Sequence, residues 1–458
     1  MLYKCIYPQP DFFPESYKYV TAAQEGLTVH FRSAGYACFL RMLHLFSTSA
    51  NLVVWVQYLL LACAFLFLYH TTAGLFYFRS RGGSVIALMG LALNPLIPVL
   101  SNQIGCEAVF TAAELVWFAL LLWVIKRHTT WALILNVLIL CLLLLLKGHV
   151  AHLLLLTILA FLFAENAGWK YKLTGMLTTV IAIGAIGIAL KKQIEKVTGT
   201  AVYSGLHGWQ IANNALYIHQ YVEVEQGGFK DPQLQAIDSL ANEYFASMSP
   251  ALQRHFEAEK VGSDFLWDNN APLKKYLALY REKSQQPYLN AWYQVSVPFE
   301  QYGRAIIYRH PGVYFRHFML PNSKNFIYPN PESLAEYGAF HEAWPEETIA
   351  YFDIKKEAVH PVDKSGLQHL LIVIYRVLHA LAIAFCFATP VIYLLLTKPL
   401  KEKRLVIYWL LFVSISIVFS VATSFVLLRN EGVWLVLALS LPLWFFGEMI
   451  IVNKSNSH

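Results

Sequence analysis

The run AVFTAAELVWFALLLWVI at 108–125, followed after a short basic connection by WALILNVLILCLLLLL at 131–146, decides the fold class. A helix needs about 20 mostly apolar residues to cross the hydrocarbon core of a bilayer, and slightly fewer inside a packed bundle. Further apolar runs of the same kind occupy 52–70, 83–100, 150–165, 173–190, 367–396, 405–428 and 432–452. The sequence therefore predicts an all-α polytopic membrane protein.

The overall composition agrees with this prediction. Of the 458 residues, 57% are hydrophobic and 14% are charged, and the mean hydropathy is +0.45. Soluble proteins carry about 25% charged residues, so a purely cytosolic protein and a disordered one are both excluded. The net charge of +6 is modest and the basic residues lie between apolar runs, which argues against a nucleic-acid partner. The cysteines form no CxxC pair and predict neither a metal site nor a disulfide framework.

The basic residues of the short connections predict the orientation. They gather in alternate connections: Arg79, Arg81, Lys126, Arg127, Lys170, Lys172, Lys398, Lys401, Lys403, Arg404 and Lys454. Short loops rich in Lys and Arg stay on the cytoplasmic side. The opposite, extracytoplasmic face then receives the first 50 residues, the connections 101–107, 147–149 and 429–431, and the long insertion 191–366.

Four regions follow from this pattern. Residues 1–50 form an external segment with amphipathic helices, 51–190 the first part of the transmembrane bundle, 191–366 an extracytoplasmic domain and 367–458 the rest of the bundle. Helix-type spacing in the insertion predicts helices over 209–222, 232–245 and 250–259. The aromatic stretch 311–330 predicts a segment lying on the bundle or against the headgroups.

The opening of the chain is polar although it is assigned to the outer face. We expect that a transmembrane helix precedes it in the full-length protein; a short translocated tail is the alternative. Within this segment, PESYKYVTAA at 14–23 predicts a helix, with Pro14 in its first position and Gly26 just past its end. Glu15 lies in the first turn, and Asp11 precedes it by four residues. Both acids could be functional or could simply cap a surface helix.

These residues resemble motifs of the GT-C glycosyltransferases, which take sugars from polyprenyl-phosphate carriers and include the protein O-mannosyltransferases and lipid A aminoarabinose transferases. Glu15, Tyr19 and Ala23 resemble the acid-xxx-Tyr-xxx-Ala opening of the first external loop, with Glu where Asp is usual. RSAGYACFL at 32–40 resembles an Arg-Pro-Pro-Gly-Tyr-Pro-x-Phe-Leu element, with alanines in place of two prolines. SNQIGCEAVF at 101–110 is similar to the second external loop.

The resemblance implies a GT-C-like helix bundle with a mainly helical extracytoplasmic domain inserted. It further implies an inverting transfer, at the periplasmic face of a bacterial inner membrane, from a polyprenyl-phosphate sugar donor to a lipid, glycan or protein acceptor. Glu15 would be the general base and Asp11 the second choice or its partner. The donor phosphate would be bound by the basic residues of the outer connections: Arg32, Lys147, His149 and Arg429. Glu107 and Tyr19 would help position donor or acceptor. No residues are assigned to a metal, although a divalent cation could assist.

Each of these side chains also has a purely structural interpretation. Arg32 could snorkel to headgroups, Lys147 could anchor a helix end, Glu107 could cap a helix, and Arg429 could pair with Glu431. A set of polar and aromatic residues in the insertion could line an acceptor groove or build the domain core: Trp209, Asn213, Trp267, Trp292, Tyr293, Arg304, His310 and Asn322.

Other functions remain open at this stage. A lipid-linked sugar transporter or flippase would need discontinuous helices, and Asn94, Pro95 and Pro98 do interrupt one apolar run. A polysaccharide polymerase or ligase would rely on arginines in the large loop, and a nonenzymatic scaffold would leave the acidic first segment unexplained.

Overall fold

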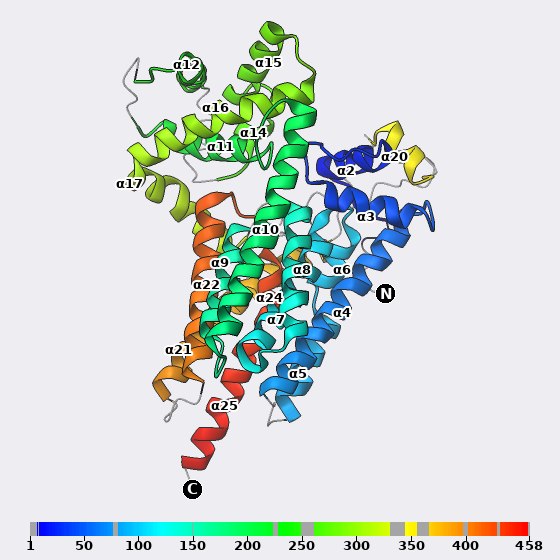
Figure 1. Ribbon diagram of the computed structural model, residues 1–458, viewed down its shortest axis with the longest axis vertical. Helices are drawn as coiled ribbons and strands as arrows, with labels where there is room; N and C mark the ends of the chain where they lie inside the picture. Colours follow the sequence, from blue (N-terminus) through cyan, green and yellow to red (C-terminus); the bar gives the residue numbers. More distant parts are fainter. Residues whose placement is uncertain are drawn as a thin grey trace.

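The chain folds into helices, with apolar helices at one end of the molecule and polar segments at the other (Figure 1). The computed structural model describes residues 7, 9–76, 81–148, 150–222, 228–248, 261–329, 344–354, 366–396, 402–427 and 431–456. These residues contain no β-strand, only an isolated bridge between Asp11 and Gln103. The predicted all-α architecture is confirmed.

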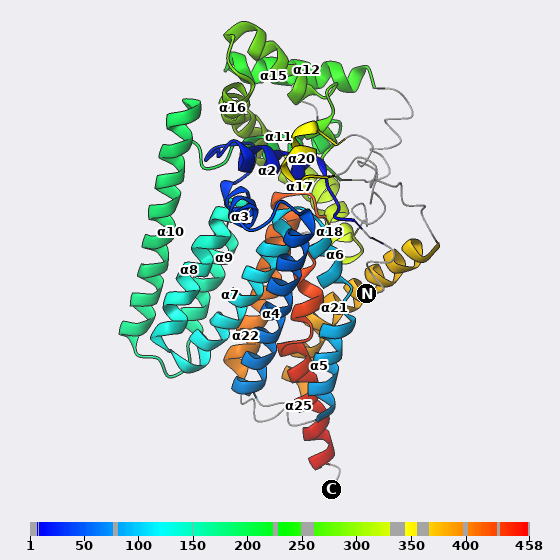
Figure 2. The same ribbon diagram turned by 90° about the vertical axis from the view of Figure 1, so that its right-hand side faces the viewer.

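Six helices in the described part of the chain are long and apolar enough to cross a membrane. They are α4 (Ala50–Phe76), α7 (Cys106–Arg127), α8 (Thr130–Lys147), α10 (Trp169–Thr198), α21 (Gly366–Leu396) and α22 (Lys403–Thr423). In the most apolar 18-residue stretch of each helix, 78% of the residues are buried in α7 and only 11% in α10. Consequently α7 forms the centre of the bundle, whereas α10 lies at its edge (Figure 2).

Two of the predicted spans are each divided into two helices, and the first divides at the Asn94-Pro95 interruption that the sequence indicated. The run 83–100 divides at Asn94-Pro95 into α5 (Arg81–Leu93) and α6 (Leu96–Asn102), because a proline inside a helix removes a hydrogen bond and clashes with the preceding turn. The run 432–452 divides into α24 (Val433–Leu437) and α25 (Leu441–Asn456).

Two further predictions need new boundaries. The span predicted at 150–165 is the 13-residue helix α9 (Ala151–Phe163). The predicted border between bundle and insertion at 190 falls inside α10, which continues for two more turns and ends at Thr198. Gly199 follows with φ +72°, a left-handed conformation that glycine adopts without a steric penalty.

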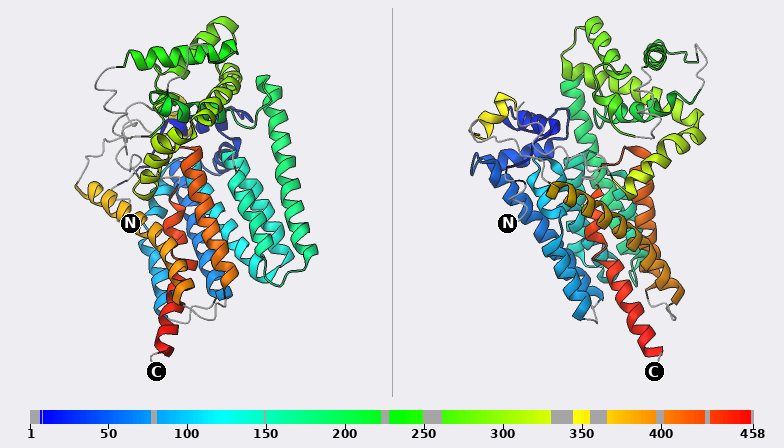
Figure 3. Two further views of the ribbon diagram at one scale, coloured as in Figure 1. Left: turned by 90° about the vertical axis from the view of Figure 1, so that its left-hand side faces the viewer. Right: turned by 180° about the vertical axis from the view of Figure 1, so that it is seen from behind.

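The remaining helices gather at the polar end of the molecule (Figures 1 and 3). They are α2 (Pro14–Gln24), α3 (Ala34–His44), α11 (His207–His219), α12 (Pro232–Ala246), α14 (Asp264–Trp267), α15 (Pro272–Ser284), α16 (Tyr288–Arg309), α17 (Pro311–Tyr314), the π-helical turn η1 (Phe315–Met319), α18 (Leu320–Ile327) and α20 (Glu346–Tyr351). The helices predicted at 14–23, 209–222 and 232–245 are confirmed within a few residues. The one predicted at 250–259 lies outside the described residues.

The insertion has an aromatic core between α11 and α16. Trp209 stacks on Trp292 with ring centroids 3.7 Å apart and planes 11° apart, and its indole N–H donates to the Trp292 carbonyl at 3.1 Å. Trp209 and Asn213 are 0% exposed, Trp292 1% and Tyr293 4%. These four residues therefore build the core of the insertion, which decides between the two roles open to them.

The aromatic segment that includes α17, η1 and α18 lies on the end of α22, as predicted. The Asn322 amide donates to the carbonyls of Val421 at 2.8 Å and Ser424 at 2.6 Å, and accepts from the Val426 N–H at 2.9 Å. The Tyr314 hydroxyl donates to the Ala422 carbonyl at 2.6 Å. The insertion thereby holds the end of α22 and the residues that follow it up to Val426.

Candidate functional site

Glu15 and Arg32 form an ion pair at the polar end of the bundle. Pro14 begins α2 and Ser16 closes its first turn, with its hydroxyl accepting from the Phe13 N–H at 2.9 Å. This local structure holds Glu15 in the first turn, where its Oε1 accepts from Arg32 Nη2 at 2.9 Å. Both side chains keep 22% of their surface exposed, so the pair is accessible from outside the protein.

Asp11, the second predicted acid, is held differently. Its N–H donates to the Asn102 carbonyl at 2.8 Å and its carbonyl accepts from the Ile104 N–H at 2.9 Å, which fixes the N-terminal segment to the connection between α6 and α7. The residue is 3% exposed. Burial, with the Asp11 carboxylate nearby, raises the pKa of Tyr7 and of Tyr17 to about 12. Glu15 is therefore the more accessible of the two acids.

Tyr19, in α2, lies close enough to Glu107, in the first turn of α7, to be influenced by its charge. Tyr19 is 6% exposed and packs edge-on against Tyr36, with centroids 5.0 Å apart. Burial raises the pKa of Tyr19 well above its usual value, and the nearby Cys106 and Glu107 add to this effect while Arg32 opposes it. Tyr19 is thus a neutral hydrogen-bond donor close to both Arg32 and Glu107.

The 32–40 element packs directly on the end of α8. A Cβ on Gly35 would lie 2.6 Å from the Leu145 carbonyl oxygen, and one on Gly148 would lie 3.0 Å from Ser33 Oγ. Such close approach requires glycine at Gly35, and Gly148 also has φ +72°. Lys147, the last residue of α8, is therefore brought beside the 32–40 element.

Lys147 also faces two acids, one in α7 and one just before α24. Its ammonium lies 4.4 Å from the centroid of the Phe110 ring and interacts electrostatically with Glu114 and Glu431. Glu431 is 7% exposed and accepts from the Trp434 indole N–H at 3.1 Å. Burial raises the pKa of Glu431 to about 7, while Trp434, Lys147 and Ser420 act in the opposite direction. His149 and Arg429, the other predicted cations, lie outside the described residues.

Gln57 is a site-supporting residue that the sequence analysis missed. It is 0% exposed; its carbonyl oxygen accepts from the Tyr36 hydroxyl at 2.8 Å, and its amide nitrogen donates to the Ser101 and Gln103 carbonyls, both at 2.9 Å. Gln57 thus joins α3, α4 and the connection that leads into α7. The sequence did contain a signal: Gln57 is a polar side chain inside the apolar run 52–70. A polar group inside a membrane span needs a hydrogen-bond partner, which indicates a structural or functional role.

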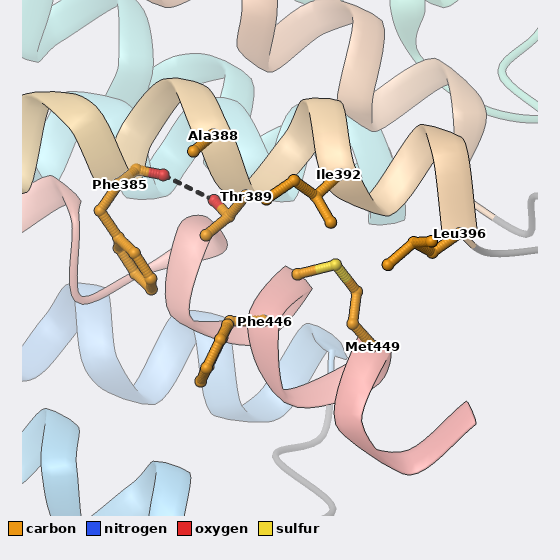
Figure 4. A pocket seen from close by; sticks show the side chains of 7 residues that line it. All are labelled: Phe385, Ala388, Thr389, Ile392, Leu396, Phe446 and Met449. Atoms are coloured by element: carbon orange, nitrogen blue, oxygen red, sulfur yellow. Dashed lines mark hydrogen bonds between the residues drawn. The ribbon is translucent and has the colours of Figure 1, made fainter. Parts of the chain in front are cut away.

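An apolar cavity lies between α21 and α25 (Figure 4), at the end of the bundle opposite α2 and α3 (Figure 1). It has a volume of about 300 Å³. It is lined by Phe385, Ala388, Thr389, Ile392, Leu396, Phe446 and Met449. The Thr389 hydroxyl is turned back to the Phe385 carbonyl at 2.7 Å, so the lining is suited to hydrocarbon.

Among the described residues, no group of three or more His, Cys, Asp and Glu side chains is arranged to hold a metal ion. Comparison of the chain with protein-family models, with curated proteins and with solved structures finds no match.

Proposed function

We propose that the chain is an integral membrane glycosyltransferase. It would transfer a sugar from a polyprenyl-phosphate donor to a lipid, glycan or protein acceptor on the extracytoplasmic face of a bacterial inner membrane. The observation that carries the proposal is the accessible Glu15–Arg32 pair, 2.9 Å apart. Such a transfer needs a carboxylate to accept a proton and a cation for the departing phosphate within the width of one sugar, and this pair supplies both. The GT-C-like order of the surrounding motifs supports the same activity.

In the proposed step, the acceptor oxygen attacks the anomeric carbon of the donor sugar from the face opposite the phosphate. The bond from that carbon to the phosphate oxygen breaks, and its electron pair leaves with the polyprenyl phosphate. The acceptor's proton goes to a Glu15 carboxylate oxygen. The configuration at the anomeric carbon is inverted, and Glu15 returns the proton to water through its exposed side.

Arg32 can serve the carboxylate and the phosphate together. Its contact with Glu15 uses Nη2, and a guanidinium carries about five N–H donors in a planar fork. Lys147 would supply a second cation, and Tyr19 a neutral hydroxyl donor. Fixed donors aimed at developing charge typically contribute about 10²- to 10³-fold to the rate each. We further propose that Glu107 helps position donor or acceptor, and that the donor phosphate is also bound by His149 and Arg429.

The test is the release of polyprenyl phosphate by purified protein from a panel of polyprenyl-phosphate sugars, measured by mass spectrometry with and without membrane-extract acceptors. We expect the Glu15→Gln variant to lose about 10²-fold or more of the activity, because the base is removed while its shape is kept. Glu25→Gln is the matched control, since Glu25 is exposed at the end of the same helix. Equal rates in the parent, Glu15→Gln and Asp11→Asn proteins would disprove the assignment of the base.

One observation favours a second candidate, a transporter or flippase of lipid-linked sugars. The two broken helices pack together, with Leu439 against Gly90 and Leu96 against Gly432, and broken helices are typical of transporters. At the first break, however, the freed Leu96 N–H is satisfied by the Asn94 side chain at 2.9 Å. Movement of a fluorescent polyprenyl-phosphate sugar across proteoliposomes, with the sugar still attached, would support this candidate over the transferase.

A further inference from the structure

Three basic side chains from distant parts of the chain surround one indole ring. The ammonium of Lys18, in α2, lies 4.3 Å from the Trp267 ring centroid. The ammonium of Lys274, in α15, lies 5.5 Å from it, and the guanidinium carbon of Arg32 lies 5.8 Å from it. We call these four residues the cation–indole cluster. It joins the N-terminal segment to the insertion, directly beside Glu15.

Trp267 is the accessible end of a stack of three indoles. It stacks on Trp292 with centroids 6.0 Å apart and planes 14° apart, and Trp292 in turn stacks on Trp209. Trp209 and Trp292 are buried, whereas Trp267 is half-buried. The two inner indoles therefore belong to the domain core, and the outer one presents part of its surface beside the three cations.

Without a bound anion, the cation–indole cluster holds three positive charges close together. Like charges repel when they are drawn together in a partly desolvated place. The pKa of Lys18 is lowered to about 8, first by burial and then by Arg32 and Lys274, while Glu15 opposes the shift. Burial likewise lowers the pKa of Lys274 to about 8. Glu15 pairs with Arg32, which leaves an excess of positive charge at the indole.

We propose that the cation–indole cluster is the acceptor subsite and binds an anionic saccharide, with a phosphate or carboxylate held by Lys18 and Lys274 and a sugar face on Trp267. This inference rests on the proposed function and names the substrate class of that site. An aromatic face suits the apolar side of a sugar ring, and clustered ammonium groups suit an anion. The anion can come from a soluble glycan or from a lipid headgroup.

The test is a binding measurement on the full chain in nanodiscs of neutral phosphatidylcholine. Glucose 6-phosphate is titrated while tryptophan fluorescence and the thermal midpoint are followed, with glucose and inorganic phosphate as comparison ligands. We expect glucose 6-phosphate to bind more tightly than either comparison ligand. Nanodiscs doped with phosphatidylglycerol form a second arm: protection by this lipid with competition against glucose 6-phosphate would identify a headgroup as the source of the same anion.

The variants separate a binding role from a structural one. Lys274→Met keeps the unbranched stem on the indoles and removes the charge, and we expect it to weaken glucose 6-phosphate binding about tenfold or more without lowering the thermal midpoint. Lys18→Met should behave in the same way. Lys275→Met, next to Lys274 on α15, is the matched control and should bind like the parent. Equal binding of glucose and glucose 6-phosphate, or a lowered midpoint with unchanged binding, would overturn the proposal.

The outcome is independent of catalysis. Glu15→Gln should still bind glucose 6-phosphate, because the base is not one of the three cations. If the parent protein binds the anion but releases no polyprenyl phosphate from any donor, the cluster stands as an anionic-saccharide site, and the proposed transferase fails together with the acceptor role of the cluster. If it transfers sugar but Lys18→Met and Lys274→Met bind glucose 6-phosphate like the parent, the transferase stands and the subsite fails.

Discussion

At the scale of single residues, the sequence can indicate contacts between side chains that are close in the chain but not between distant ones. The Glu15–Arg32 pair joins residues of one helix and the loop that follows it, so the sequence could indicate both members. The meeting of Lys18 with Lys274 and Trp267 depends on how the insertion folds back over α2. No local pattern carries that information, and the sequence analysis assigned no role to either lysine.

Raising the pH from 7 to 9 is predicted to weaken binding of glucose 6-phosphate. Lys18 and Lys274 lose their charges as the pH passes their pKa of about 8, while the phosphate, with its second pKa near 6, keeps its charge. The charged groups that face Lys18 are Arg32, Glu15 and Lys274, and the neutral His30 lies nearby.

Over the same pH interval the free energy of unfolding of the ligand-free protein should rise. A lysine in the unfolded chain has a pKa of 10.5 and still binds the proton that the folded state has released, so the unfolded state binds more protons. Thermal melts and titrations at both pH values measure the two effects. An affinity that stays constant or increases from pH 7 to pH 9 would contradict the role of the lysines.

Among the helices, hydropathy predicted where the chain is apolar but not where it breaks. Both breaks carry a proline signal: Pro95 precedes α6, and Pro442 lies in the first turn of α25. Proline at these positions is typical of a helix start. The broken helices also pack against each other, and a count of apolar residues cannot show such packing.

Close contact between α3 and the end of α8 gives a prediction for Gly35→Ala. The added methyl would lie 2.6 Å from the Leu145 carbonyl oxygen, so the helices must move apart. Overpacking of this kind costs about 1 to 3 kcal/mol, and we expect a lower thermal midpoint together with reduced transfer, because Arg32 and Lys147 lie on either side of the contact. Gly312→Ala is the control, since a Cβ there meets no atom within 4 Å. Equal midpoints for Gly35→Ala and Gly312→Ala would contradict this packing.

At the scale of the whole molecule, the N-terminal segment, the insertion and the connection after α22 occupy one end of the bundle (Figure 1). The sequence predicted this co-location from the alternation of basic connections. It could not predict which side chains meet there, because those contacts join segments that are far apart in the chain. Asn322, which fixes the connection after α22, is one such contact.

Labelling with a membrane-impermeant maleimide tests the predicted orientation. Asn270 is exposed between α14 and α15, and Lys170 is exposed at the opposite end of α10. In intact cells, Asn270→Cys should be labelled and Lys170→Cys should be labelled only after permeabilisation, as read by peptide mass spectrometry. The reverse pattern would place Glu15 on the cytoplasmic face.

The most direct measurement is a density map of the protein with a bound polyprenyl-phosphate sugar. We predict that the phosphate lies within about 3.5 Å of the nitrogens of Arg32 or Lys147, with the anomeric carbon of the sugar facing Glu15. A phosphate found at the opposite end of the bundle, beside the apolar cavity between α21 and α25, would contradict the proposed transferase site.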